Sequence, residues 1–374
     1  MMNGTYFSGT SSSGNETIPV CFNINTSSIG AIRFSSDRFS KIFSAMGLLS
    51  NLFALLVLWK SFQRTTSRSR SSFLIFLCGL VVTDFMGLLV TGSIVVSYHI
   101  THFKWQELDP QCHLCNFMGI SMVFYGLCPL MLGASMAVER FMGINRPFSR
   151  SANMSKTRAC SVVAMVWVSA GCIGLLPLLG LGSYRLQLPG SWCFLNISSE
   201  PLDMTFSLIF SLVGLLSLVT SFLLNTVSVI TLLRVCCGQD SGQRRRDHEV
   251  EMMVQLIWIM IIASICWCPL LVFIAQTVLS RGKLEVPKLL LWIRFATFNQ
   301  ILDPWVYILF RRSILRRIYP SMGWSRGSIL TLYSASMRRL TRASLGGDLD
   351  QKSGRQAAGY TKPVALVQSP TSQC

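Results

Sequence analysis

Long apolar runs alternate with short polar connections over most of this chain. Seven runs consist largely of Leu, Ile, Val, Met and Phe, and each approaches the roughly 20 residues that a helix needs to cross a bilayer. A transmembrane β-barrel would instead show shorter segments of alternating polarity. Because backbone polar groups in lipid must be satisfied within the segment, we interpret the runs as helices. The predicted spans are 42–59, 73–98, 117–138, 159–181, 204–233, 252–279 and 289–310.

The change in composition outside the spans divides the chain into three regions. Residues 1–40 are rich in Ser, Asn and Gly, residues 41–319 hold the seven-transmembrane domain, and residues 320–374 lack periodicity, as expected of a disordered tail. Just after the last span, Ile314, Leu315 and Ile318 share one helical face and arginines lie elsewhere. We therefore expect an all-α fold, a seven-transmembrane helix bundle with a short amphipathic membrane-surface helix after the seventh span.

The net charge of +17 comes from basic residues that flank the spans. Most Lys and Arg residues follow spans one, three, five and seven, and few lie on the opposite side. The positive-inside rule therefore predicts a multi-pass plasma-membrane protein with an extracellular amino terminus and a cytoplasmic carboxyl terminus. We attribute the charge to topology and to attraction by anionic lipid, and not to nucleic-acid binding.

Several residues on the predicted outer side suit an oxidising, secretory environment. Sequons for N-glycosylation begin at Asn3, Asn15 and Asn25 in the first region and at Asn196 in the loop before span five. Residues 1–40 contain no continuous apolar core, so we expect the first span, and not a cleavable signal, to direct insertion.

Four of the thirteen cysteines lie on the predicted outer side. They are Cys21, Cys112, Cys115 and Cys193. An even set in an oxidising compartment indicates two disulfides, and four cysteines allow three pairings.

Arg294 is the one basic side chain within a predicted span. A charge at the centre of a membrane helix costs about 2.5–3.5 kcal/mol, so such a residue usually marks a functional site, here one for an anionic ligand. The alternative is snorkelling, because Arg294 lies only about 7.5 Å along the helix from Leu289. The binding interpretation is favoured because Lys288 already provides an interfacial anchor.

Acidic residues are scarce within the spans. Asp84, Asp303 and Glu139, at the inner end of span three, do not lie in the outer half of the bundle, where a cationic amine would need a carboxylate. This distribution favours an anionic ligand beside Arg294.

The sequence carries no signature of an enzyme. The four histidines have no metal-ligand spacing, and neither a Ser/His/Asp arrangement nor a phosphate-binding loop is present. We therefore expect no catalytic residues, no metal and no cofactor. A transporter would be expected to show broken half-helices and an inverted repeat, and neither is seen. A transporter of organic anions stays open as an alternative from a different class.

Six motifs occur in order along successive spans. They are Asn51, Asp84, Glu139-Arg140-Phe141, Trp167, Cys266-Trp267-Cys268-Pro269 and Asp303-Pro304-Trp305-Val306-Tyr307. With these motifs, residues 40–320 resemble the rhodopsin-like G-protein-coupled receptors. Within that superfamily, Arg294 and the loop Leu188-Pro189-Gly190-Ser191-Trp192-Cys193-Phe194 resemble the prostanoid receptors.

The resemblance to prostanoid receptors implies a ligand and a set of contacts. The ligand would be a fatty-acid derivative whose carboxylate pairs with Arg294, and its selectivity among prostanoids, including the prostaglandins, stays open. The expected roof of the pocket consists of Ser191, Trp192 and Phe194. Thr91 and His99 are candidate polar contacts, although a helix-packing threonine and an interfacial histidine are equally good interpretations.

The resemblance also implies a mechanism and signalling partners. Repacking near Trp267, above Pro269, would move span six and release Arg140, for which Glu139 and Glu249 are the candidate restraints. The implied partners are heterotrimeric G proteins of the Gq class, acting through phospholipase C and calcium, and of the twelve/thirteen class, together with receptor kinases and arrestin at the tail. The other motif residues expected to take part are Asp84, Asp303, Pro304 and Tyr307.

The same resemblance implies one pairing of the outer cysteines. The family's bridged cysteine at the start of span three corresponds to Cys115, which would pair with Cys193. A prostanoid receptor similar to this chain ties its amino terminus to the loop before span three, which implies that Cys21 pairs with Cys112.

Some residues depart from the general pattern of the superfamily. Pro129 replaces a small polar residue near Asp84, which argues against a sodium site of the usual composition. Met122 replaces the aspartate of amine receptors, and Thr297 replaces the retinal-binding lysine of opsins. Amines and retinal are thereby excluded as ligands.

Overall fold

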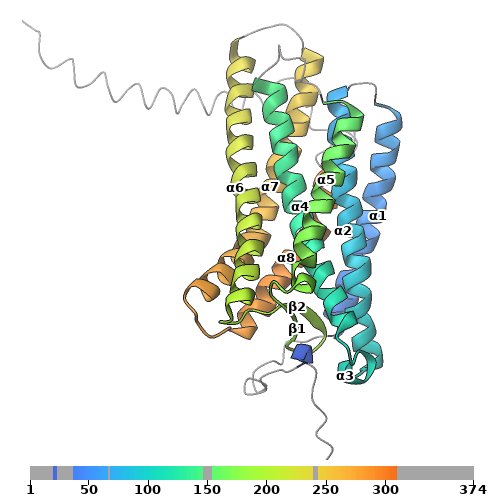
Figure 1. Cartoon of the computed structure of the whole chain (residues 1–374). Helices are drawn as coiled ribbons and strands as arrows, with labels where there is room; N and C mark the ends of the chain where they lie inside the picture. The colour runs from blue at the N-terminus through green and yellow to red at the C-terminus, as the bar shows by residue number, and fades with distance from the viewer. Residues whose placement is uncertain (1–19, 23–36, 66–67, 146–153, 239–242, 310–374) are drawn as a thin grey trace, which may run out of the picture. The chain divides into compact units, whose positions relative to one another are not determined.

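The described part of the chain contains seven long helices that run along one another in a bundle (Figure 1). This computed structural model describes residues 20–22, 37–65, 68–145, 154–238 and 243–309, all within a compact unit of residues 1–318. The second unit, residues 319–374, and the predicted surface helix at 311–319 lie outside the described residues. The seven helices are α1 (Asp37–Gln63), α2 (Arg68–Thr101), α4 (His113–Asn145), α5 (Lys156–Leu175), α6 (Pro201–Gly238), α7 (Gln243–Leu279) and α8 (Val286–Leu309).

Each long helix corresponds to one predicted span. Most extend beyond the predicted ends by several residues, because polar residues can continue a helix after it leaves the apolar layer. The exception is the fourth span, which was predicted to reach Leu181. There α5 ends at Leu175 and a single 3-10 turn, η3 (Leu176–Leu179), follows. Pro177 has no backbone N–H to continue the helix, and Gly180 ends the turn with φ 93° in the left-handed region.

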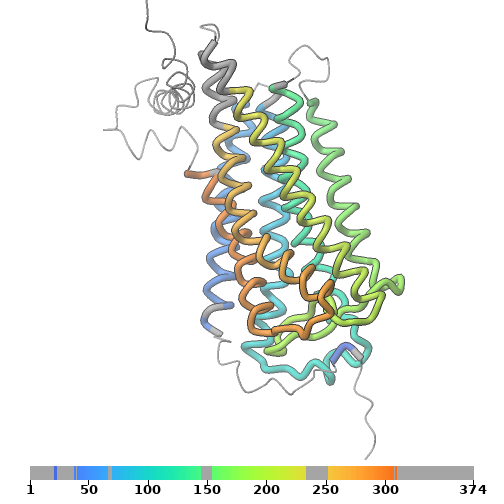
Figure 2. Tube along the Cα trace, turned by 90° about the vertical axis from the view of Figure 1, so that its left-hand side faces the viewer, coloured from blue at the N-terminus to red at the C-terminus, as the bar shows by residue number. Residues whose placement is uncertain are grey.

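Short elements gather at one end of the bundle (Figures 1 and 2). They are η1 (Val20–Phe22), α3 (Trp105–Leu108) and the strands β1 (Tyr184–Gln187) and β2 (Trp192–Leu195). The two strands pair antiparallel, with Tyr184 opposite Leu195 and Gln187 opposite Trp192. This hairpin was not predicted from the sequence, in which both strands are too short to show a clear alternating pattern.

The helices pack against one another on their inner faces and expose apolar side chains on their outer faces. α4 packs against α2, α5, α6 and α7, while α8 lies against α1, α2 and α7. Large apolar side chains such as Leu49 on α1, Val168 on α5 and Leu216 on α6 are more than half exposed. Because lipid is the solvent along these faces, such exposure costs nothing, and the outward faces identify the surface that contacts the bilayer.

Six of the described helices are long and apolar enough to span a membrane. The seventh, α8, falls short because Arg294, Asn299, Gln300 and Asp303 interrupt its apolar run. Asn299, Gln300 and Asp303 are buried, so α8 directs its polar residues into the bundle. Polar residues concentrated in a buried membrane helix indicate a functional element.

Buried side chains tie neighbouring helices together. Asn51 is fully buried on α1, and its Nδ2 donates hydrogen bonds to the carbonyl oxygens of Gly47 (2.9 Å) and Gln300 on α8 (2.8 Å). Trp167 Nε1 on α5 donates to Thr83 Oγ1 on α2 at 3.1 Å. Two motif residues of the sequence thus serve as contacts between helices.

Replacement of Asn51 by Leu should destabilise the bundle. The change removes the side-chain amide that donates to the Gln300 carbonyl and leaves this buried acceptor without that hydrogen bond, at a cost of about 1–3 kcal/mol. The temperature at which detergent-solubilised receptor loses its monodisperse peak in size-exclusion chromatography should fall. Ser93→Ala, which removes an exposed hydroxyl bonded within α2, is the control and should leave that temperature unchanged.

Candidate functional site

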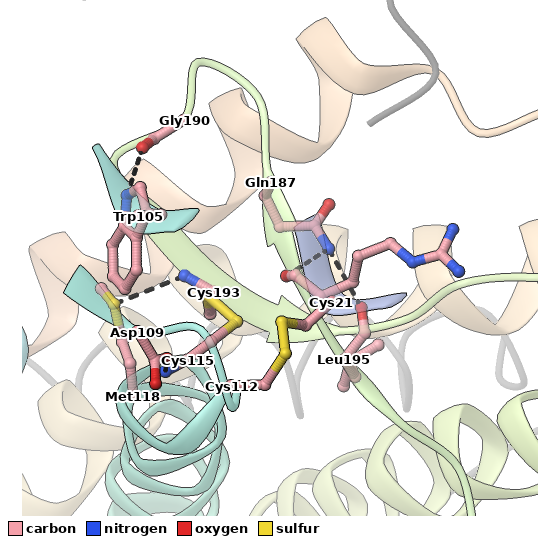
Figure 3. Close-up of a disulfide and its surroundings, with 11 residues drawn as sticks. Cys21, Trp105, Asp109, Cys112, Cys115, Met118, Gln187, Gly190, Cys193 and Leu195 are labelled. Carbon is pink, nitrogen blue, oxygen red and sulfur yellow. Dashed lines mark hydrogen bonds between the residues drawn. A yellow bond between two sulfur atoms is a disulfide. The ribbon is translucent and has the colours of Figure 1, made fainter. Parts of the chain in front are cut away.

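The β1–β2 hairpin, residues 184–195, forms a lid that one disulfide connects to α4, while a second disulfide connects η1 to the residue just before α4 (Figure 3). Cys193 on β2 is bonded to Cys115 in the first turn of α4, with their Cα atoms 5.3 Å apart. Cys112 precedes α4 and is bonded to Cys21 in η1, with a Cα–Cα distance of 6.2 Å. These are the two pairings that the family resemblance implied.

Hydrogen bonds hold the lid in place around the first disulfide (Figure 3). Trp105 Nε1 on α3 donates to the carbonyl oxygen of Gly190 in the hairpin turn at 2.8 Å. The carboxylate of Asp109 accepts a hydrogen bond from the backbone N–H of Cys115 at 2.9 Å, which fixes the start of α4. The lid is therefore attached at its turn as well as at its second strand.

Tyr184 on β1 anchors the other strand of the lid in a slot between α4 and α5. Its hydroxyl donates to the carbonyl oxygen of Gly174 at 2.7 Å, and its ring lies so close to Gly119 that any Cβ there would overlap it. Phe206 on α6 closes the slot with an edge contact to the same ring at 5.8 Å between centroids. Burial raises the pKa of the Tyr184 phenol, so it stays a neutral donor.

The residues predicted as the roof of the pocket are buried in the lid. Ser191, Trp192 and Phe194 are each at most 5% exposed. Phe194 makes an edge contact with Phe210 of α6, at 5.7 Å between ring centroids. Both lid aromatics belong to the hydrophobic cluster that includes Ala296 and the partly buried Ile293 of α8. The lid and the first half of α8 therefore share one apolar interior.

Arg294 lies in that part of α8. It follows Val286, the first residue of α8, by about 12 Å along the helix, and it is partly buried. Lys288, by contrast, is exposed and pairs with Glu285 at 2.8 Å. The two basic residues of α8 thus have different environments, and Arg294 is the one placed within the bundle.

The two candidate polar contacts on α2 differ in burial. Thr91 is partly buried, and its hydroxyl donates to Gly87 O of its own helix at 2.6 Å, which leaves its oxygen lone pairs as acceptors. His99 is 7% exposed and lies against the Tyr98 ring at 5.5 Å between centroids. His99 is buried despite its place in the last turn of α2.

The opposite end of the bundle contains a buried ion pair. Arg140 Nε donates to Glu139 Oε2 at 2.6 Å and Nη2 to Oε1 at 2.5 Å, and both side chains are at most 5% exposed. Ser72 Oγ on α2 donates to the same carboxylate at 2.7 Å, and Arg140 Nη1 contacts Met252 Sδ on α7 at 3.5 Å. Glu249 is the predicted second restraint on Arg140, and its side chain is not among those that the structure describes.

Trp267 lies in the middle of the bundle, two residues before Pro269 in α7. It is 6% exposed, and a Cβ added to Gly126 on α4 would come 2.8 Å from its ring. The absence of a side chain at Gly126 lets the edge of the indole ring approach α4 closely. Any rotation of this ring must therefore change the contact between α4 and α7.

Two carboxylates are buried in the bundle, and one of them faces a small cavity between α4, α6, α7 and α8. Asp303 lines the cavity with Asn225, Asn299 and Pro129, and Asn299 Nδ2 donates to Asp303 Oδ2 at 2.8 Å.

Asp84 is fully buried, and neither of its oxygens has a hydrogen-bond partner among the described residues. Pro304 is buried next to Asp303, and Tyr307 belongs to α8, with its side chain outside those described.

The predicted modification sites have different places in the structure. Asn3, Asn15 and Asn25 lie outside the described residues. Asn196 follows β2 directly and is only 8% exposed, which differs from the exposed loop position expected of a glycan acceptor.

This arrangement of seven helices, lid and buried motif residues matches a known family. A model of the 7 transmembrane receptor (rhodopsin family) matches residues 50–307. The crystal structure of squid rhodopsin superimposes with a TM-score of 0.63 at 20% identity, covering 77% of this chain and 84% of that one, which shows the common fold. The chain belongs to the rhodopsin family of seven-transmembrane receptors, and it is a multi-pass membrane receptor and not an enzyme.

Within this family the chain is similar to thromboxane A2 receptors. The receptor from Bos taurus is 57% identical, with 82% of this chain and 92% of the relative covered, and that from Homo sapiens is 56% identical, with 77% and 87% covered. The prostaglandin F2-alpha receptor from Homo sapiens is 41% identical over 75% of this chain and 79% of its own length.

Sequence reasoning missed several residues that position the lid. Gly119, Tyr184 and Trp105 matter through contacts between segments far apart in the sequence, and no local pattern signals them. Asp203 carried a partial signal, because an acidic residue in the first turn of a helix is a common stabilising feature.

Gly119→Ala should displace Tyr184 and weaken the attachment of the lid. The added methyl overlaps the phenol ring, and overpacking of this kind costs about 1–3 kcal/mol. We expect a lower midpoint of thermal unfolding, measured with a thiol-reactive dye on purified receptor. Gly171→Ala is the matched control, since its Cβ would make an ordinary contact of 3.9 Å with Phe124.

A second substitution separates overlap with Tyr184 from a general loss of helix packing. Tyr184→Leu has a smaller side chain, so it should restore part of the stability lost by Gly119→Ala in the double variant. If the double variant loses the sum of the stabilities lost by the two single variants, the ring of Tyr184 does not fill the space beside Gly119.

Proposed function

We propose that this receptor binds the carboxylate of a prostanoid lipid, thromboxane, within the helix bundle and signals through G proteins. The observation that carries the proposal is the partly buried Arg294 in a helix whose neighbouring side chains share one apolar cluster with the lid. A guanidinium presents two parallel donors to a carboxylate, and the low dielectric strengthens that pair. The similarity to thromboxane A2 receptors supports thromboxane as the ligand.

The remaining contacts follow from the apolar interior. The rings and acyl chains of a prostanoid would fill space between the helices beneath Ser191, Trp192 and Phe194, and Thr91 and His99 would face its polar groups. The lid is fixed by the Cys115–Cys193 disulfide, by the hydrogen bond from Trp105 to Gly190 and by Tyr184. A lid attached so firmly favours entry of the ligand from the lipid bilayer.

Signalling would start at Trp267 and end at Arg140. A ligand that moves Trp267 changes the contact with Gly126 and bends α7 at Pro269. Movement of α7 carries Met252 away from Arg140, which frees the arginine from part of its surroundings. Asp84, Asp303, Pro304 and Tyr307 would transmit the same change along α8, and Glu249 would add a second restraint on Arg140.

The proposed orientation places the lid outside the cell and Arg140 inside. The cytoplasmic face would bind G proteins of the Gq class, which activate phospholipase C and calcium release, and of the twelve/thirteen class. Receptor kinases and arrestin would act on the Ser and Thr residues of the tail. The basic connections between the helices support this orientation, because they lie at the Arg140 end.

Arg294→Gln should reduce the affinity for carboxylate prostanoids at least about tenfold, or about 1.4 kcal/mol, because the amide cannot form a charge-assisted pair. Competition binding of a stable thromboxane mimic to surface-expressed receptor measures the change. Lys288→Gln removes a positive charge from the exposed start of the same helix and is the control. Equal affinities in Arg294→Gln and in the unaltered receptor would rule out this anion site.

Glu139→Gln should raise signalling in the absence of ligand. The amide removes the negative charge that holds Arg140, and loss of one partner of a buried ion pair costs about 3–5 kcal/mol. Basal inositol phosphate accumulation, normalised to surface expression, provides the measurement. Glu107→Gln, which breaks an exposed pair with Lys104, should leave the basal level unchanged, and the interpretation fails if both variants behave alike.

A further inference from the structure

The carboxylate of Asp203 accepts hydrogen bonds from three side chains, one just before β1 and two just after β2. Asp203 lies in the first turn of α6 and is 6% exposed. Ser183 Oγ, just before β1, donates to Oδ1 at 2.9 Å, while Asn196 Nδ2, just after β2, and Ser198 Oγ donate to Oδ2 at 2.6 and 2.7 Å. We call these four residues the Asp203 latch.

The latch uses both hydrogens of the Asn196 amide. Nδ2 donates to Asp203 Oδ2 and also to Ser183 Oγ at 3.2 Å. The backbone N–H of Asn196 donates to the Ser183 carbonyl at 2.9 Å, so main chain and side chain hold this residue in the same place. The hydroxyl of Ser198 also accepts a bond from the Glu200 backbone N–H at 3.2 Å.

We propose that the sequon at Asn196 carries no glycan in the folded receptor and that its side chains instead fasten the end of the lid to α6. Asn196 and Ser198 are the first and third residues of the sequon, and both are bonded to Asp203. An N-linked sugar replaces one hydrogen of Nδ2, so it would remove one of these bonds. It would also require open space at a side chain that is 8% exposed.

The hydrogen bonds of the latch stabilise the buried carboxylate of Asp203. A buried carboxylate needs hydrogen-bond donors, and bonds to an ionised acceptor are stronger than neutral ones. Its place in the first turn of α6 adds a favourable interaction with the helix dipole. Loss of the Asn196 donor would leave Oδ2 with the hydrogen bond from Ser198 but without the one from Asn196. The folded state therefore disfavours any modification of Asn196.

Site-by-site mass spectrometry tests the occupancy of the sequon. Full-length receptor is purified from the surface of mammalian cells and treated with peptide-N-glycosidase in heavy-oxygen water, which labels each formerly occupied asparagine as aspartate. We expect the peptide that contains Asn196 to be unlabelled, with Asn3, Asn15 and Asn25 as internal comparisons. Labelled Asn196 in most surface molecules would overturn the proposal.

Substitutions at neighbouring serines test the latch itself. Ser198→Ala removes the sequon together with one donor to Asp203, so it should lower the midpoint of thermal unfolding by about 4 °C without reducing the apparent mass on a gel. Ser198→Thr keeps the hydroxyl and should retain the original midpoint. Ser199→Ala, at an exposed position in the same segment, is the matched control and should do the same.

Two results would contradict the proposal in different ways. A loss of one glycan mass in Ser198→Ala would show that the sequon is used. Equal unfolding midpoints for Ser198→Ala and Ser199→Ala would show that the bond to Asp203 does not fasten the lid. Both measurements are made without ligand, so they stand apart from the identity of the lipid that the receptor binds.

Discussion

The absence of water from the bilayer core is the constraint on which the structure depends. A polar group on a membrane helix is stabilised by a partner inside the protein, because lipid offers none. Asn51, Thr83 and Trp167 meet this requirement by bonding across helices, and Arg140 meets it with Glu139. The same requirement explains why the helices most exposed to lipid carry apolar outer faces. The polar interior is thus both the support of the bundle and the place where signals can pass.

The lid lies at the end of the bundle, outside the long apolar helices, and different interactions stabilise it. Disulfides, aromatic contacts and backbone hydrogen bonds replace the burial of long apolar helices. The lid is held at Cys193, Gly190 and Tyr184, and Asn196, directly after it, is bonded to Asp203 of α6. A lid with several attachments presents its aromatic side chains in fixed positions, which would limit the entropy lost on binding of the ligand that we propose.

The sequence predicted the helices well because each apolar run contains its own signal. It failed at Leu181, where Pro177 and Gly180 end the fourth helix earlier than hydrophobicity suggests. It also missed the hairpin, whose short strands depend on contacts with α4 and α6. Motif residues such as Arg140 and Trp267 could be found by resemblance, whereas their partners Met252 and Gly126 required the structure. The pairing of the four outer cysteines also came from the resemblance, since the sequence alone left three pairings open.

The slot that receives Tyr184 has a consequence for how such receptors diverge. Gly119 leaves no room for a side chain beside the ring, and the carbonyl of Gly174 accepts its hydroxyl. A substitution on α4 at this point is tolerated only if the first strand of the lid changes as well. We therefore expect residue 119 of α4 and residue 184 of β1 to change together, although 65 positions of chain separate them.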